Sequence, residues 1–159
     1  MRIGSGYDAH RLKKGRPMIL CGVCIPSDFG PDGHSDADAP LHALCDAMLG
    51  ALALGDIGTH FPDTGGSYRG ADSRELLSHA YRLVGDRGYA LGNADITIIL
   101  QAPKLGPNID DMRESIARIL GCGPERISVK ATTEEFMGFT GSGEGIAASA
   151  VVLLKKNRG

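Results

Sequence analysis

The sequence predicts an α/β (α+β) fold, with a single mixed β-sheet and helices packed mainly on one face. Segments with the apolar content of strands alternate along the chain with segments that show helical spacing of apolar residues. A layer of helices on a sheet buries the apolar surface of both. No linker, repeat or low-complexity stretch divides the chain, so we expect one domain over residues 1–159.

The first half of the chain contains two expected strands and one expected helix. Strands are predicted at residues 1–9 and 17–26, with a turn that contains Lys and Gly between them. A helix is predicted from about Asp38 to Leu54. Asp38 is a favourable N-cap, and Pro40 is tolerated in the first turn of a helix.

The second half adds two helices and a strand before a glycine-rich turn. A helix is predicted to begin near Asp72, because Asp72 and Glu75 have the spacing of a capping box. A strand at residues 94–100 and a third helix, capped by Asn108, are expected next. The strand at residues 126–133 then leads into the glycine-rich turn.

The last predicted strand, "GIAASAVVLL" at residues 145–154, has small or aliphatic residues on both faces. We therefore expect both of its faces to be buried. Helices are expected on one side of the sheet only, so the other side needs a partner. This requirement suggests an oligomer.

Composition argues against several classes of protein. Seventeen basic and nineteen acidic residues leave a net charge of −2, so no partnership with nucleic acid or with a membrane surface is expected. No apolar run reaches the ~20 residues of a membrane helix.

The sequence pattern of a strand begins at the first residues, without the pattern of a signal or transit peptide, and we expect a cytoplasmic protein. Cys21 and Cys24 lack two further soft ligands at matching spacing and are interpreted as structural thiols.

Three residues suggest a metal site. Asp8 and His10 are two apart in a predicted strand and so point to the same face. His42 lies in the first turn of the predicted helix and adds a second imidazole. One oxygen and two nitrogens with an open fourth position suit a catalytic zinc, and Asp46 is a candidate to orient His42. The alternative is ordinary polar residues at a strand end and a helix start.

Three further clusters have both functional and ordinary interpretations. Asp56 and Asp63 flank a glycine-containing loop, and taken alone this pattern favours a solvated turn. Lys104 precedes a helix start, where anionic groups bind well, but an exposed loop lysine explains it too. The segment "KATTEEFMGFTGSGEG" at residues 130–145 offers hydroxyls, carboxylates and backbone N–H groups to a phosphate and its cation.

These clusters resemble one family in order and spacing. The matching segments are "GYDAH", "HSDADAPLHAL", "DIGTHFPDT", "ADSRELL", "QAPK" and "KATTEEFMGFTGSGEGIAA". Together they are similar to the 2-C-methyl-D-erythritol 2,4-cyclodiphosphate synthases of the non-mevalonate isoprenoid pathway. The resemblance implies a cyclase that acts on a cytidine diphosphate substrate, 4-diphosphocytidyl-2-C-methyl-D-erythritol 2-phosphate, and releases CMP. It also implies a homotrimer with sheets facing its centre and active sites between subunits.

The resemblance also implies sets of site residues. The zinc ligands would be Asp8, His10 and His42, and the ligand of Mg²⁺ or Mn²⁺ would be Glu135. Transition-state stabilisation would fall to His34 and Thr133. The substrate-binding set would be Asp8, Ala9, His10, His34, Ser35, Asp56, Ile57, Gly58, Phe61, Pro62, Asp63, Thr64, Gly65, Phe139 and Ser142. The cytidine and phosphate set would be Leu100, Gln101, Ala102, Pro103, Lys104, Leu105, Gly106, Ala131, Thr132, Thr133 and Glu134.

The implied chemistry agrees with these residue types. The attacking group is the substrate's own 2-phosphate, which is already anionic, so no Ser or Cys nucleophile is needed. Positioning and charge neutralisation then dominate the catalysis. Ser142 stands where many members carry a basic residue linked to an isoprenoid diphosphate on the threefold axis, which puts that ligand in doubt here.

Two alternatives remain open from the sequence. A zinc-dependent phosphohydrolase could use the same three ligands with a metal-bound water, and it would give uncyclised products. A non-catalytic nucleotide-binding trimer would bind nucleotide without metal dependence. The second alternative leaves Asp8, His10 and His42 without a purpose.

Overall fold

The computed structural model describes residues 1–61 and 72–157, and these form a five-stranded sheet in the order β4-β1-β7-β5-β6. The strands are β1 (Arg2–Lys14), β4 (Phe29–Pro31), β5 (Tyr89–Ile99), β6 (Ile127–Thr132) and β7 (Gly145–Lys156). The pair β5 and β6 is parallel, and the other neighbours are antiparallel. The predicted mixed sheet is therefore confirmed.

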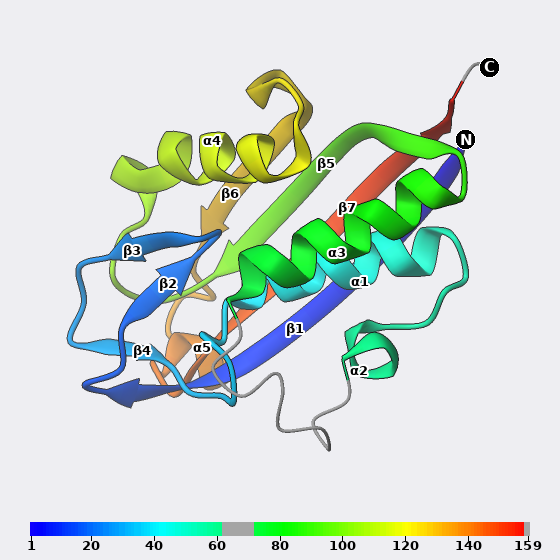
Figure 1. The fold of residues 1–159 in the computed structure, drawn as a ribbon. Helices are drawn as coiled ribbons and strands as arrows, with labels where there is room; N and C mark the ends of the chain where they lie inside the picture. Colours follow the sequence, from blue (N-terminus) through cyan, green and yellow to red (C-terminus); the bar gives the residue numbers. More distant parts are fainter. Residues whose placement is uncertain (62–71, 158–159) are drawn as a thin grey trace.

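Three helices lie on the same side of this sheet (Figure 1). They are α1 (Ala39–Ala51), α3 (Ser73–Asp86) and α4 (Ile109–Leu120). The shorter elements are α2 (Ile57–His60), α5 (Gly138–Gly141) and the 3₁₀ turns η2 (Gly106–Asn108) and η3 (Pro124–Arg126). No helix among the described residues is long and apolar enough to cross a membrane.

The core fills the space between the helices and the sheet. Its largest fully buried side chains include Leu44 and Met48 of α1, Leu77 of α3, Ile96 of β5 and Met112 of α4. The helical spacing of these apolar residues puts them on the inward faces of their helices. The predicted layered architecture thus has one continuous core.

The helix starts follow the expected caps with one exception. The Asp38 carboxylate accepts a hydrogen bond from the Leu41 N–H at 3.2 Å, and that of Asp72 accepts from the Arg74 N–H at 2.9 Å. Asn108 precedes α4 as predicted, but its side chain makes no capping bond within the described chain. The turn η2 leads into α4 instead, so this part of the prediction is wrong.

Two glycines let α1 lie directly on β1. A Cβ on Gly4 would come within 2.0 Å of the Ala47 carbonyl oxygen, and one on Gly6 within 2.0 Å of the Ala43 carbonyl oxygen. Only glycine permits so close an approach of two backbones. This contact fixes where residues farther along β1 stand relative to the first turn of α1.

Several element boundaries differ from the prediction. Strand β1 extends well past residue 9, because it pairs first with β7 and then, from Leu12 to Lys14, with β4. The predicted strand at 17–26 is a hairpin of β2 (Met18–Leu20) and β3 (Val23–Ile25). The turn between these strands has positive φ angles at Cys21 and Gly22.

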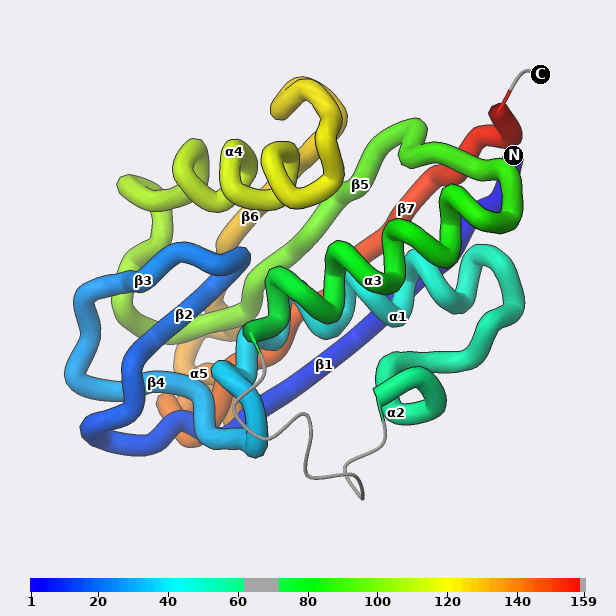
Figure 2. The backbone as a smooth tube through the Cα atoms, in the orientation of Figure 1, coloured from blue at the N-terminus to red at the C-terminus, as the bar shows by residue number. Residues whose placement is uncertain are grey.

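The sheet face opposite the helices carries apolar side chains. Strands β1 and β7 run side by side, and the start of β1 lies beside the end of β7 (Figure 2). Gly4 and Gly6 face α1, so Ile3 and Tyr7 point the other way, and they are 73% and 58% exposed. Val151 of β7 is 44% exposed. We expected both faces of the last strand to be buried. Within one chain, only the face toward the helices is buried.

Candidate functional site

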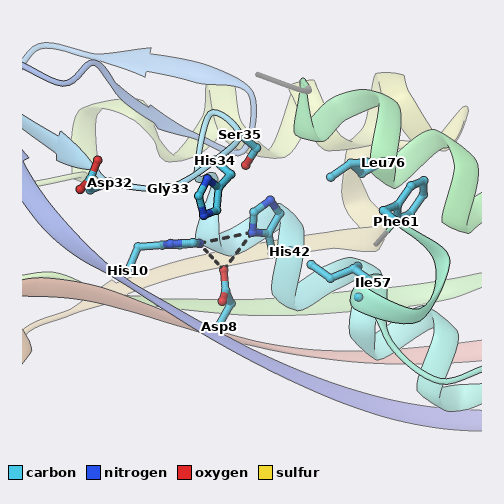
Figure 3. Close-up of a pocket in the computed structure, with 11 residues that line it drawn as sticks. Asp8, His10, Asp32, Gly33, His34, Ser35, His42, Ile57, Phe61 and Leu76 are labelled. Atoms are coloured by element: carbon cyan, nitrogen blue, oxygen red, sulfur yellow. Dashed lines mark hydrogen bonds and ion pairs between the residues drawn. The ribbon is translucent and has the colours of Figure 1, made fainter. Parts of the chain in front are cut away.

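The predicted metal ligands converge. Asp8 and His10 extend from β1 toward His42 of α1, as Figure 3 shows. The Asp8 Oδ2 lies 2.8 Å from the His10 Nε2 and 3.0 Å from the His42 Nδ1, and the two nitrogens are 3.4 Å apart. One ligand atom from each residue lies within 4.8 Å of the others. The fold therefore brings the three predicted ligands together as a possible metal-binding group.

The donor set fits a divalent metal. Burial opposes ionisation of Asp8, but hydrogen bonds and charge from His10 and His42 outweigh it and hold the pKa of this carboxyl well below its usual range. Burial is the largest single influence on His42 and lowers its pKa, but the hydrogen bond with Asp8 and the negative charges of Asp8, Asp38 and Asp36 together raise that pKa by more. A carboxylate oxygen and two imidazole nitrogens aimed at one point are a typical zinc-binding set.

The second ring nitrogen of His42 contacts a residue that the sequence reasoning missed. His42 Nε2 lies 2.9 Å from the Ser73 Oγ, and the Ser73 hydroxyl donates to the Asp36 carboxylate. The Asp46 carboxylate instead accepts from the Ile57 N–H at 2.8 Å. The prediction that Asp46 orients His42 is therefore wrong. Ser73 follows an N-cap at a helix start, so nothing in its local pattern pointed to the site.

A cavity of about 450 Å³ opens beside the metal ligands (Figure 3). It is lined by Asp8, His10, Asp32, Gly33, His34, Ser35, His42, Ile57, Gly58, Phe61 and Leu76. Seven of the fifteen predicted substrate-binding residues are thus brought together here. Asp56 caps α2, accepting from the Thr59 N–H and hydroxyl. The predicted Pro62, Asp63, Thr64 and Gly65 lie outside the described residues.

Arg16 holds the loop that carries His34 and Ser35. Its Nε donates to the Pro31 carbonyl at 3.2 Å. Its Nη2 donates to the carbonyls of Gly33 at 3.3 Å and Ser35 at 3.2 Å. Three bonds from one guanidinium fix the backbone on both sides of His34. This role cannot be predicted from the sequence, because "KKGRPM" has the composition of an exposed turn.

A second cavity, of about 380 Å³, lies at the ends of β5 and β6. It is lined by Leu100, Gln101, Pro103, Lys104, Leu105, Gly106, Pro107, Ala131, Thr132 and Thr133. This set contains most of the predicted cytidine and phosphate residues. Ala102 lines a neighbouring cavity with Ser142, and the Glu134 carboxylate accepts from the Thr140 hydroxyl. Among the described residues the first and second cavities share no lining residue.

Glu135 lies in a strained, exposed turn beyond β6. The Thr133 hydroxyl donates to the Glu135 Oε1 at 3.2 Å, which places the two predicted residues side by side. Glu135 and Phe136 have φ angles of 50° and 65°, an uncommon conformation for residues with a side chain. Phe136 and Met137 are 77% and 67% exposed. Phe139 lines a third cavity with Ala9 and His10.

Together the fold and the two cavities define an α/β protein with a metal-ligand cluster and a separate pocket of a size that suits small ligands. Residues 1–155 match the model of the YgbB family, and the chain belongs to this family. The 2-C-methyl-D-erythritol 2,4-cyclodiphosphate synthase of Trichlorobacter lovleyi is 60% identical over 154 residues, which cover 97% of this chain and 98% of that protein.

Solved structures agree with this assignment. A structure of 2C-methyl-D-erythritol-2,4-cyclodiphosphate synthase has a TM-score of 0.90 and 47% identity, and the match covers 97% of this chain and 100% of that one. A form of such a synthase with bound CDP has a TM-score of 0.90 and 45% identity, with the same coverage of both chains. The resemblance seen in the sequence is confirmed.

Proposed function

We propose that this cyclodiphosphate synthase works through a metal centre at Asp8, His10 and His42 and a cytidine pocket around Lys104. The reaction converts 4-diphosphocytidyl-2-C-methyl-D-erythritol 2-phosphate to 2-C-methyl-D-erythritol 2,4-cyclodiphosphate and CMP for isoprenoid synthesis. The observation that carries the proposal is the convergence of the three ligand atoms beside a cavity, in a chain of this family. The relative with bound CDP supports a nucleotide in the second pocket.

The reaction is a transfer within one substrate molecule. An oxygen of the 2-phosphate forms a bond to the phosphorus of the diphosphate that is attached to the methylerythritol. The bond from that phosphorus to the bridging oxygen breaks, and its electron pair leaves with CMP. Neither water nor a redox partner is consumed. The protein must therefore hold two anions together and keep water away from the phosphorus.

The chain's residues divide this work. Asp8, His10 and His42 would hold Zn²⁺ and Glu135 would hold Mg²⁺ or Mn²⁺, and bound cations would act as Lewis acids that neutralise phosphate charge. His34 and Ser35 line the first cavity, where they can donate hydrogen bonds to phosphate oxygens. The Thr133 hydroxyl can donate a hydrogen bond to the phosphate that leaves with cytidine, and the Lys104 ammonium can neutralise its charge.

The first cavity also has an apolar side that suits the sugar-like part of the substrate. Ile57, Phe61 and Leu76 line it next to the polar residues. These side chains can pack against the methyl and carbon skeleton of methylerythritol and displace water. Exclusion of water favours cyclisation over hydrolysis.

A homotrimer completes the proposed site. Since the metal cavity and the cytidine cavity share no lining residue among the described residues, we assign the two halves of each working site to neighbouring chains. Ile3, Tyr7 and Val151 on the uncovered sheet face would be buried where three sheets meet around an axis. We further propose a single functional domain over residues 1–159 in the cytoplasm, in line with the biosynthetic role of the relatives.

Product analysis by phosphorus NMR tests the proposed reaction. The purified protein is incubated with the cytidyl substrate, Zn²⁺ and Mg²⁺ in water enriched in ¹⁸O. Cyclisation predicts a cyclic diphosphate and CMP, both without ¹⁸O from the solvent. Linear phosphates that carry ¹⁸O would instead identify a phosphohydrolase, and the absence of any product would identify a nucleotide-binding protein without catalysis.

A further inference from the structure

We propose that Ser73 and Asp36 form a hydrogen-bond relay that fixes the tautomer of His42 and so directs its Nδ1 lone pair at the metal position. Both act as positioning residues, because Ser73 contacts His42 and Asp36 contacts Ser73. The inference rests on the proposed metal-dependent function and assigns a task to residues on the far side of the ligand.

The geometry gives the two nitrogens of His42 different partners. Nδ1 lies 3.0 Å from the Asp8 Oδ2 and 3.4 Å from the His10 Nε2, on the side of the other ligands. Nε2 lies 2.9 Å from the Ser73 Oγ. A neutral imidazole carries its proton on one nitrogen only, and a metal binds the other. The partner of Nε2 therefore decides whether Nδ1 is available to a metal.

The donors and acceptors of the relay set its direction. The single hydroxyl proton of Ser73 is donated to the Asp36 carboxylate, so toward His42 the Ser73 oxygen can only accept. His42 must then carry its proton on Nε2. An ionised Asp36 is an acceptor only, and it also receives the Ser73 N–H at 3.0 Å and the Asp38 N–H at 3.3 Å. These three hydrogen bonds fix the orientation of the Asp36 carboxylate.

Burial strengthens the preference for this tautomer. Ser73 is fully buried and His42 is 7% exposed, so solvent is a poor substitute partner for Nε2. A buried N–H without a partner is strongly disfavoured. The relay is also separate from the cap of α3, because the Asp72 carboxylate supplies that cap by accepting from the Arg74 N–H. Holding the start of the helix does not by itself explain the Ser73 hydroxyl.

The substitution Asp36→Asn reverses the relay. The Asn oxygen would keep the Ser73 N–H, which makes the shorter of the two backbone bonds, and the NH₂ group would donate to the Ser73 Oγ. Ser73 would then donate its proton to the Nε2 of His42. The imidazole proton would move to Nδ1, where it competes with the metal. Ser73→Ala removes the relay without reversing it, so Asp36→Asn should have the larger effect.

The test measures tautomer and metal affinity separately. ¹⁵N NMR of metal-free Asp8→Ala at about pH 9, a background without the carboxylate that would itself hold a proton on Nδ1, should show the proton on the Nε2 of His42, and adding Asp36→Asn should move it to Nδ1. Competition with a zinc chelator should show affinity about 10-fold weaker in Ser73→Ala and up to about 100-fold weaker in Asp36→Asn. Ser73→Thr, which keeps the hydroxyl, should restore both properties.

Asp72→Ala is the matched control, because it weakens the start of α3 and leaves the relay intact. It should change neither the tautomer nor the zinc affinity. A proton on the Nδ1 of His42 in the Asp8→Ala background, where no carboxylate accepts from this nitrogen, would overturn the proposal. So would unchanged tautomers and affinities in Ser73→Ala and Asp36→Asn. Since these readouts need no turnover, they decide the relay even if the cyclase assignment fails.

Discussion

The two halves of the proposed site are built in opposite ways. The metal half joins a long strand to a helix in direct backbone contact, and its ligand atoms already lie within 4.8 Å of one another. The half that carries Thr133 and Glu135 lies beyond the end of β6, in an exposed turn with positive φ angles. The three metal ligands come together within one chain, whereas the turn that carries Glu135 is exposed at the surface. Preorganisation comes from the fold in the first region, whereas the proposed trimer assigns it to a neighbouring chain in the second.

The metal half should fail completely when one ligand is lost. We expect His42→Ala to lose bound zinc and to lower turnover by about 10³-fold or more, since several kcal/mol of charge stabilisation would be removed. Elemental analysis and a CMP-release assay measure these effects, with circular dichroism to show that the variant remains folded. Full zinc occupancy in this variant would remove His42 from the site.

Loss of the close contact between β1 and α1, which supports the metal ligands, should have the next largest effect. Gly6→Ala puts a Cβ against the Ala43 carbonyl and forces β1 away from α1, so we expect a loss of about 3 kcal/mol in the free energy of unfolding and weaker zinc binding. Denaturant unfolding measures this loss. Gly85→Ala is the matched control, because a Cβ there meets open space on α3, and it should be neutral or stabilising by up to about 1 kcal/mol.

The surface half should depend on one of its two adjacent glutamates. Glu134 accepts from Thr140, whereas Glu135 lies next to Thr133 and is exposed. We expect Glu135→Gln to keep zinc, lose its response to added Mg²⁺ or Mn²⁺ and turn over about 10²-fold more slowly. Glu134→Gln should stay within a few-fold of wild type. Titration of each variant with Mg²⁺ measures the difference, and equal behaviour would contradict a single cation ligand.

The same contrast explains what the sequence could predict. Asp8, His10 and His42 were identified because strand alternation and a helix start are local patterns that reach from sequence to geometry. The partner of His42 was assigned wrongly, since Ser73 is 31 residues away in sequence and comes close only through the packing of α3 on α1. Arg16 was missed for a similar reason, because its three acceptors are carbonyl groups of a distant loop.

The smallest expected effect is the pH dependence of the metal-free protein. His42 has a pKa raised above its ordinary value of 6.5: burial lowers it, but the hydrogen bond with Asp8 and the nearby carboxylate charges together outweigh burial. Its contribution to stability is therefore present below about pH 6.5 and is lost as the pH rises through the folded-state pKa. Zinc should reverse this trend, because it binds the neutral imidazole.

Thermal unfolding of the metal-free and zinc-bound protein between about pH 6 and pH 9 tests this prediction. The fall in Tm of the metal-free protein should be smaller in His42→Gln, which has no imidazole to titrate. A metal-free wild type whose Tm rises over this range in step with the zinc-bound form would contradict the assigned role of the Asp8–His42 pair.

Subunit exchange tests the central claim most directly, namely that the two halves of a working site come from different chains. His42→Ala breaks the metal half and Lys104→Ala breaks the cytidine half, so each purified variant should be nearly inactive. Mixed in equal amounts and reassembled, they should regain about a quarter of wild-type activity, because each half is intact in half of the chains. A trimer by light scattering that shows verified exchange and no recovery would contradict the shared site.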